Sequence, residues 1–158
     1  MSAPEHEFYL KVARSLGGCQ LVEQELKLYI TESLQLAQKC IGGRMTFKFS
    51  GEDYSDAPLE GLIKTFKKLT DNATLVSELS TFKNERNFLS HRAISTCTDP
   101  DGELSHQEIL DLSSRLETIQ KEADRLVAAL NEEANRFRGH LYFDEIKGPE
   151  LGNRDGQE

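Results

Sequence analysis

The chain has 158 residues, of which 29% are charged and 37% are hydrophobic, and its formal net charge is -8. This length suits one compact domain, and the composition is that of a soluble folded protein. The negative balance argues against a protein that coats nucleic acid through its overall charge, although it leaves room for a small phosphate site.

Three single cysteines, Cys19, Cys40 and Cys97, form no CxxC pair and no Cys/His metal spacing. We therefore expect reduced thiols, no metal and no cofactor. The opening "MSAPEHEFYL" lacks the basic and apolar regions of a signal peptide, and no apolar run approaches the roughly 20 residues of a membrane span. These features predict a cytoplasmic protein without a membrane partner.

The first predicted element is one long helix that ends at Gly42-Gly43, because apolar residues recur every three or four positions before it. Gly17-Gly18 lies inside this helix, where each glycine costs roughly 1 kcal/mol. The pair indicates either a kink or break, or a close contact with another helix. The apolar stripe comprises Phe8, Val12, Leu16, Cys19, Val22, Leu26, Ile30, Leu34, Ala37 and Ile41.

A loop is predicted from Arg44 to Pro58, followed by a short helix that Asp56 caps and that has Pro58 in its first turn. The next helix begins at Asp71 or Asn72 and extends to about Thr96. The apolar stripes of these two helices are Leu59, Leu62, Ile63, Phe66 and Leu69, and then Leu75, Leu79, Phe82, Arg86, Leu89 and Ala93.

The segment "CTDPDGE" predicts a turn before the last helix. Ser105 and Glu108 form the S-x-x-E pattern of a capping box, and the helix should be over by Gly139. Its regular stripe packs in the bundle core or against a second subunit. The stripe is Ile109, Leu112, Leu116, Ile119, Ala123, Leu126 and Leu130.

These elements predict an all-α antiparallel bundle of four to five helices in a single domain, residues 1–143. The polar, glycine-rich end "GPELGNRDGQE" predicts a flexible tail, which we assign to residues 144–158.

The stretch "RNFLSH" concentrates polar groups on the third main helix. Asn87 and His91 are four residues apart and share one face, whereas Arg86 lies about 140° from His91 around the axis. Arg86 also interrupts the apolar stripe between Phe82 and Leu89, where a buried guanidinium needs an anionic or polar partner. We therefore expect Arg86 at a groove or subunit seam beside the histidine.

These groups match what metal-free RNA cleavage requires. Histidine can transfer protons near neutral pH, arginine can stabilise charge on a phosphate, and an amide such as that of Asn87 can orient either. One histidine per chain is awkward for two proton transfers, and a twofold dimer would bring two copies together. The alternative, a solvated helix surface, stays open at this point because short motifs recur by chance.

The segment "ERNFLSHR" resembles the R-x4-6-H motif of the HEPN superfamily, in its R-N-x3-H form. The preceding "LEGLIKTFKKL" and "LVSELSTFKNERNFLSH" are similar to the family's approach to this motif, and a long helix on either side also agrees. The resemblance spans about residues 6 to 138, although only the motif segment is specific.

The resemblance implies a helical homodimer whose two motifs face each other across a cleft, with metal-independent endoribonuclease activity, often in toxins or antiviral effectors. It makes Arg86 and His91 catalytic, with Asn87 in support, and implies products with a 2′,3′-cyclic phosphate and a 5′-hydroxyl. An antitoxin or regulatory protein would be a further partner. Ala93 stands where one toxin branch has a modifiable tyrosine, so that form of control is not supported.

A local excess of cations surrounds the motif and could guide an RNA substrate, although a solvated face of mixed charge would look the same. Two other functions remain open: a catalytically silent helical dimer that acts as a protein- or RNA-binding scaffold, and a nucleotide-binding role that no phosphate-cradling glycine loop supports. The candidate RNA-binding residues are Lys64, Lys67, Lys68, Lys83 and Arg92.

Overall fold

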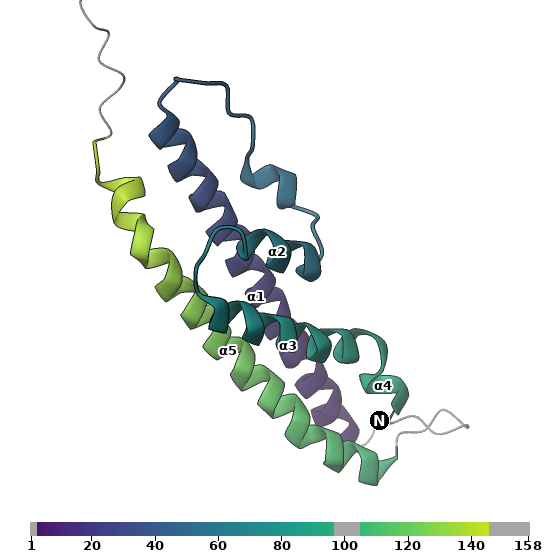
Figure 1. Cartoon of the computed structure of the whole chain (residues 1–158). Coiled ribbons are helices and arrows are strands. Elements are labelled where there is room, and N and C mark those ends of the chain that lie inside the picture. Colours follow the sequence, from purple (N-terminus) through teal and green to yellow (C-terminus); the bar gives the residue numbers. More distant parts are fainter. Residues whose placement is uncertain (1–2, 97–104, 146–158) are drawn as a thin grey trace, which may run out of the picture.

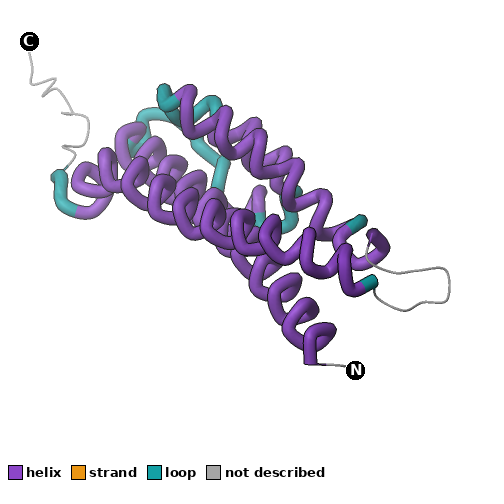
Figure 2. The backbone as a smooth tube through the Cα atoms, turned by 90° about the horizontal axis from the view of Figure 1, so that it is seen from below, coloured by secondary structure: helices purple, strands orange, loops and turns teal. Residues whose placement is uncertain are grey.

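The computed structural model describes residues 3–96 and 105–145, and within them every regular element is a helix (Figures 1 and 2). The predicted all-α bundle of four to five helices is confirmed. No helix in these two ranges is long and apolar enough to cross a membrane. The elements are α1 (Ala3–Ile41), a short 3-10 helix η1 (Gly51–Tyr54), α2 (Leu59–Phe66), α3 (Ala73–His91), α4 (Ala93–Thr96) and α5 (His106–Tyr142).

The two longest helices, α1 and α5, lie side by side and run parallel (Figure 1). Near one end the Ser15 hydroxyl donates to the Leu116 carbonyl at 2.9 Å, and further along Arg138 Nε pairs with Glu32 Oε2 at 2.8 Å. Sequence number therefore rises in the same direction along both helices. The reason is that α2 and α3 carry the chain back, so α5 starts at the end where α1 starts.

Helix α3 does run antiparallel to α5. Its N-cap, Asn72, contacts Glu133, and Glu85 further along α3 contacts Arg115, so sequence number rises along one helix as it falls along the other. The core fills the space where α2 and α3 cover the α1–α5 pair. Its most completely buried side chains are Phe8, Cys19, Val22, Leu26, Ile30, Leu62, Phe66, Leu79, Leu116, Leu126 and Leu130.

The glycine pair does not break α1, so the prediction of one long helix is confirmed. Gly18 lies against α5, where an added Cβ would come within 3.0 Å of Ala123 Cβ. A Cβ at Gly17 would meet nothing within 4 Å. The sequence allowed either a kink or break, or a close contact with another helix. The structure shows the close contact at Gly18, whose missing side chain lets α1 and α5 approach each other.

Two predicted details of α2 are wrong. Pro58 is its N-cap and supplies no side-chain hydrogen bond, while Asp56 lies outside the helix in the preceding turn. Because α2 ends at Phe66, Leu69 leaves the helical stripe and is 36% exposed.

The start of α3 agrees with prediction, because the Asn72 side chain caps it by accepting from Leu75 N at 3.0 Å. Its end does not: α3 stops at His91, Arg92 interrupts it, and α4 is a separate turn that ends at Thr96. This break puts the candidate histidine at a helix terminus and not in a helix interior.

Ser105 is the N-cap of α5 as predicted, but its side chain makes no capping hydrogen bond, so the capping-box expectation is wrong. The helix also continues three residues past Gly139, to Tyr142. The predicted turn at 97–103 and the predicted tail from residue 146 onward lie outside the described residues.

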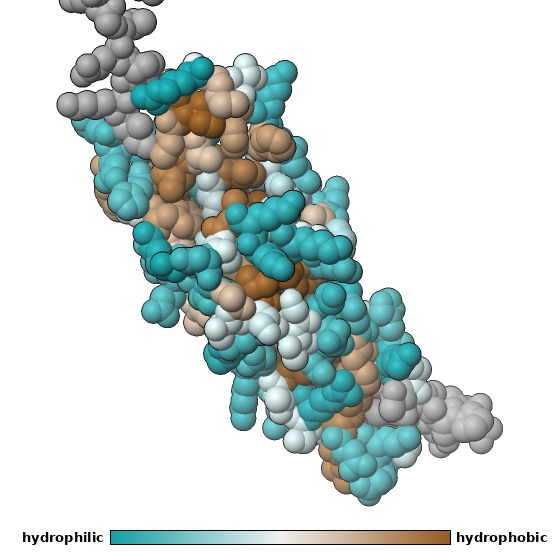
Figure 3. Space-filling view, viewed as in Figure 1, coloured by the Kyte–Doolittle hydropathy of each residue, from teal (hydrophilic) through white to brown (hydrophobic). Residues whose placement is uncertain are grey.

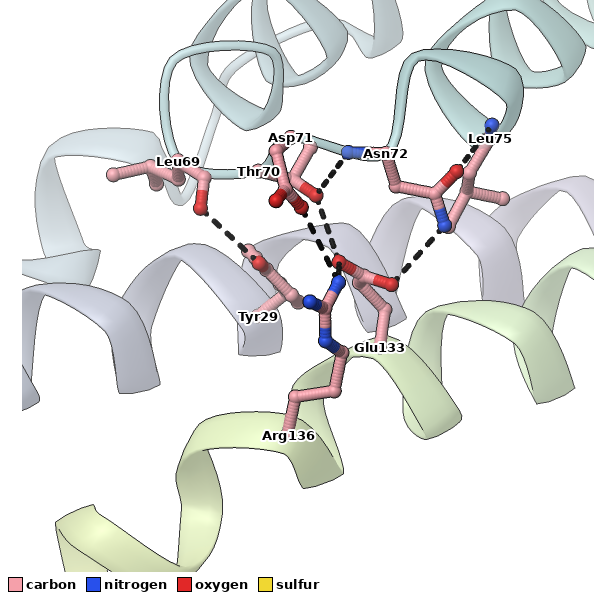
Figure 4. Close-up of polar contacts among 8 residues, drawn as sticks. All are labelled: Tyr29, Leu69, Thr70, Asp71, Asn72, Leu75, Glu133 and Arg136. Atoms are coloured by element: carbon pink, nitrogen blue, oxygen red, sulfur yellow. Dashed lines mark hydrogen bonds and ion pairs between the residues drawn. The ribbon is translucent and has the colours of Figure 1, made fainter.

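A buried carboxylate on α5 fixes the loop that begins α3 (Figure 4). Glu133 accepts hydrogen bonds from the Thr70 hydroxyl at 2.8 Å and from Asn72 Nδ2 at 3.1 Å, and it pairs with Arg136 Nη1 at 3.0 Å. Arg136 also reaches Asp71 Oδ1 at 3.2 Å. Asn72 both caps α3 and donates a hydrogen bond to Glu133. This network therefore sets where α3 starts and how it lies on α5.

Candidate functional site

The C-terminal end of α3 borders a shallow open groove of about 630 Å³ that also touches α5. Polar and cationic side chains supply almost all of its lining, and one aromatic ring completes it. Figure 3 shows hydrophilic side chains interspersed with hydrophobic ones, which gather in the upper half and the centre of the view. The lining residues are Asn84, Asn87, Phe88, His91, Arg92 and Arg115.

The structure brings two of the three predicted catalytic residues into this groove. Asn87 and His91 are one turn apart on α3, and both are exposed. No hydrogen bond to the His91 ring occurs within residues 3–96 and 105–145. The imidazole is therefore accessible to an incoming hydroxyl or phosphate.

Arg86, the third predicted catalytic residue, turns away from this groove toward α1. Its Nε lies 3.1 Å from Glu23 Oε1, and the two side chains are 34% and 17% exposed. The partner that the apolar-stripe position demands is thus a carboxylate of the same chain. The structure does not place Arg86 with Asn87 and His91.

Arg115 lines the groove from α5 and was missed by the sequence reasoning. Its guanidinium forms a two-point ion pair with Glu85, at 2.9 and 3.1 Å, and lies 3.6 Å from the centre of the Phe88 ring. Both contacts hold the planar group in place, as carboxylate pairing and cation–π stacking require. No local motif marks Arg115, because its partners on α3 are about thirty residues away along the chain.

The predicted RNA-binding residues divide between two grooves. Arg92 lines the groove with His91, whereas Lys64, Lys67 and Lys83 line a second one, of about 230 Å³, between α2 and α3. Lys64 is paired with Glu60 at 3.1 Å. Lys68 is exposed just past α2 and lines neither groove.

These two grooves follow the same face of α3. Lys83, Asn87 and His91 are spaced by four residues each, so they form one line along the helix. A strand of phosphates laid along this line would pass the lysines before reaching the histidine.

Among the described residues, no group of three or more His, Cys, Asp or Glu side chains could hold a metal ion.

A third groove, of about 570 Å³, runs between α3 and α5 over an apolar floor that includes Phe82 and Ile119. The charges at its rim satisfy one another: Arg125 pairs with Glu78 at 3.0 Å and with Glu122 at 2.7 Å. This mutual pairing leaves that rim poorly suited to an anion. Arg115 lines both this groove and the one that contains His91 and is likewise paired, so Arg92 is the guanidinium of the His91 groove without an ion pair among the described residues.

Comparisons with protein-family models, with curated proteins and with solved structures find no match to this chain.

Proposed function

We propose that the chain is a metal-independent endoribonuclease of the HEPN type, of the kind used as a toxin or antiphage effector. The observation that carries the proposal is the groove in which the exposed His91 lies with Asn87, Arg92 and Arg115. An accessible imidazole beside an amide and two guanidinium groups is the set that phosphodiester cleavage uses. The resemblance of "RNFLSH" to the family motif supports the same reaction.

In this mechanism one His91 removes the proton from a ribose 2′-hydroxyl, and the 2′-oxygen attacks the adjacent phosphorus. The bond to the 5′-oxygen breaks, and that oxygen takes a proton from a second imidazole. The products are a 2′,3′-cyclic phosphate and a 5′-hydroxyl, and no metal or co-reactant is consumed. The second imidazole comes from another copy of the chain, which makes a homodimer part of the proposal.

Cationic side chains supply the phosphate binding and charge stabilisation that the reaction also needs. Arg92 and Arg115 lie where they can offset charge on the phosphate oxygens, and Lys83 precedes them on the approach along α3. Arg86 takes part as a phosphate-binding group by exchanging Glu23 for the phosphate when RNA binds. Replacing Glu23 with glutamine should then leave cleavage intact, whereas Arg86→Ala should reduce it.

The test compares wild type, His91→Ala and His106→Ala on end-labelled RNA with EDTA present. His106 is an exposed histidine at the start of α5 and serves as the matched control. We expect chelator-insensitive cleavage by wild type and by the control, and a loss of about 100-fold or more in His91→Ala. Equal cleavage by wild type and His91→Ala would contradict the proposal, provided that circular dichroism shows both folded.

The Arg86–Glu23 ion pair favours a second candidate, a catalytically silent helical scaffold that binds RNA or protein. In that case Arg86 is purely structural, and its pair with Glu23 ties α3 to α1. The distinguishing result is RNA binding by wild type without any cleavage, together with loss of stability in both Arg86→Ala and Glu23→Gln.

A further inference from the structure

The outer face of α1 carries three leucines that the described part of the chain leaves about half exposed. Leu10, Leu21 and Leu28 are 42%, 55% and 43% exposed, although they belong to the longest helix of the fold. At about 100° per residue they fall within a sector of roughly 20°, on the side opposite the stripe that α1 buries in the core. Gly17 lies on the same line, and a Cβ there would meet nothing within 4 Å.

We propose that this face binds the same face of a second copy of the chain, with the two α1 helices antiparallel and the twofold axis near residue 19. The positions on this face alternate by four and three residues, the spacing with which helices pack side by side. They are Leu10, Arg14, Gly17, Leu21, Gln24 and Leu28.

The antiparallel arrangement matches every position to a suitable partner. Leu10 meets the partner's Leu28, and Gly17 leaves room for the partner's Leu21, so a large side chain enters the space that a missing one provides. Arg14 meets the partner's Gln24, whose amide oxygen can accept from the guanidinium. Each of these contacts occurs twice because the axis repeats it.

Charges beside this face select the same direction. Lys11 pairs with Glu117 at 3.0 Å and with Glu7 at 3.5 Å in its own chain, and antiparallel pairing adds the partner's Glu25 beside it, again twice. Glu25 makes no ion pair within the part of its own chain that the structure describes. Parallel pairing would instead press Arg14 against the partner's Arg14, in the middle of the contact. Like charges at such a position are unfavourable, so the sequence selects the antiparallel form.

This contact is separate from the one proposed for catalysis and does not rest on it. The face with Leu21 lies on the far side of α1 from its buried stripe, whereas Arg86 reaches α1 from α3 on another side. Pairing through α1 therefore does not bring the two His91 side chains together. Chains that make both contacts form an assembly of four if the two twofold axes cross at right angles, and chains that make only the α1 contact form a dimer.

Light scattering with matched variants tests the proposal. Leu21→Glu puts a charge in the centre of the contact, and Leu110→Glu makes the same change at an equally exposed leucine on α5, since both are 55% exposed. We expect Leu21→Glu to halve the mass of the assembly and Leu110→Glu to leave it unchanged. A monomeric wild type, or equal masses for wild type and Leu21→Glu, would overturn the proposal.

Cross-linking tests the direction. Gln20 and Gln38 are both exposed on α1, and the 18 residues between them are five full turns, so they share a face. Antiparallel pairing puts the two Gln20 positions side by side and the two Gln38 positions about 57 Å apart, at 1.5 Å per residue.

The experiment uses a short bismaleimide on Gln20→Cys and Gln38→Cys, each with Cys40 and Cys97 replaced by serine. We expect covalent dimers from Gln20→Cys only. Dimers from both variants would indicate a parallel contact, and dimers from Gln38→Cys alone would indicate a different surface; either result overturns the proposed arrangement.

Discussion

Cys19 and Cys40 belong to the same helix but differ in their surroundings. Cys40 is exposed, whereas Cys19 is 2% exposed among core side chains. Burial raises the pKa of the Cys19 thiol from 9.0 to about 11, although the nearby Arg86 guanidinium opposes part of the increase. The neutral thiol is therefore the form that the folded state favours.

This shift predicts how stability changes at high pH. The unfolded chain loses the thiol proton near pH 9, and the folded chain loses it only near pH 11. The contribution of the neutral Cys19 thiol to the free energy of unfolding is therefore complete below pH 9 and is lost as pH rises toward 11. Urea unfolding at pH 8 and pH 10.5 should show a larger loss for wild type than for Cys19→Ala. Equal losses would contradict the assignment.

At pH 8, iodoacetamide should modify Cys40 well before Cys19, as peptide mapping can show.

At this scale the sequence could indicate that Arg86 needs a partner but not which one. Its place in an apolar stripe predicts an anionic or polar contact for the guanidinium, and Glu23 provides one. Glu23 is 63 residues away along the chain, and finding it requires the way in which α3 crosses α1. Arg115 was missed for the same reason.

Among the elements, α3 depends on α5 for its starting point through Glu133. Glu133→Ala removes the carboxylate that accepts hydrogen bonds from Thr70 and Asn72. Both donors then lose this acceptor in a partly buried site. We expect a loss of about 3 kcal/mol in the free energy of unfolding, as for other charged hydrogen-bond networks. Urea denaturation measures this loss directly.

Glu132→Ala is the control, because Glu132 is the exposed neighbour on the same helix. Its effect should stay within about 0.5 kcal/mol. A similar small effect for Glu133→Ala would show that the loop does not need this carboxylate.

Helix positions could be predicted from sequence because their apolar stripes are long and regular, and α1 and α5 agree closely with expectation. Their relative direction could not. An apolar stripe packs equally well against a parallel or an antiparallel neighbour, and the choice depends on how the chain between them folds back. Arg92 likewise gives no local signal that α3 ends there.

For the molecule as a whole, the net charge of -8 contrasts with the cations along α3. If these cations bind RNA phosphates, Lys67→Glu with Lys83→Glu should weaken binding of single-stranded RNA and reduce its dependence on salt. Losing two phosphate contacts lowers the slope of log K against log salt by about 1.4. Fluorescence anisotropy over a range of salt concentrations measures both effects.

The control is Lys48→Glu, an exposed lysine in the loop between α1 and α2, which should bind as wild type does apart from the change in net charge. An unchanged slope in the double variant would remove Lys67 and Lys83 from the proposed RNA path. His91 could still act in that case, with a different approach for the substrate.

The parallel course of α1 and α5 has an electrostatic consequence. Their peptide dipoles add, and two helices give about one elementary charge at each end of the pair, positive at the end nearest His91. The chain offsets both: Glu5 and Glu108 lie in the two first turns, and at the other end Lys39 donates to the carbonyls of His140 and Leu141. With the dipoles balanced in this way, any attraction of phosphate toward His91 has to come from arginine and lysine side chains.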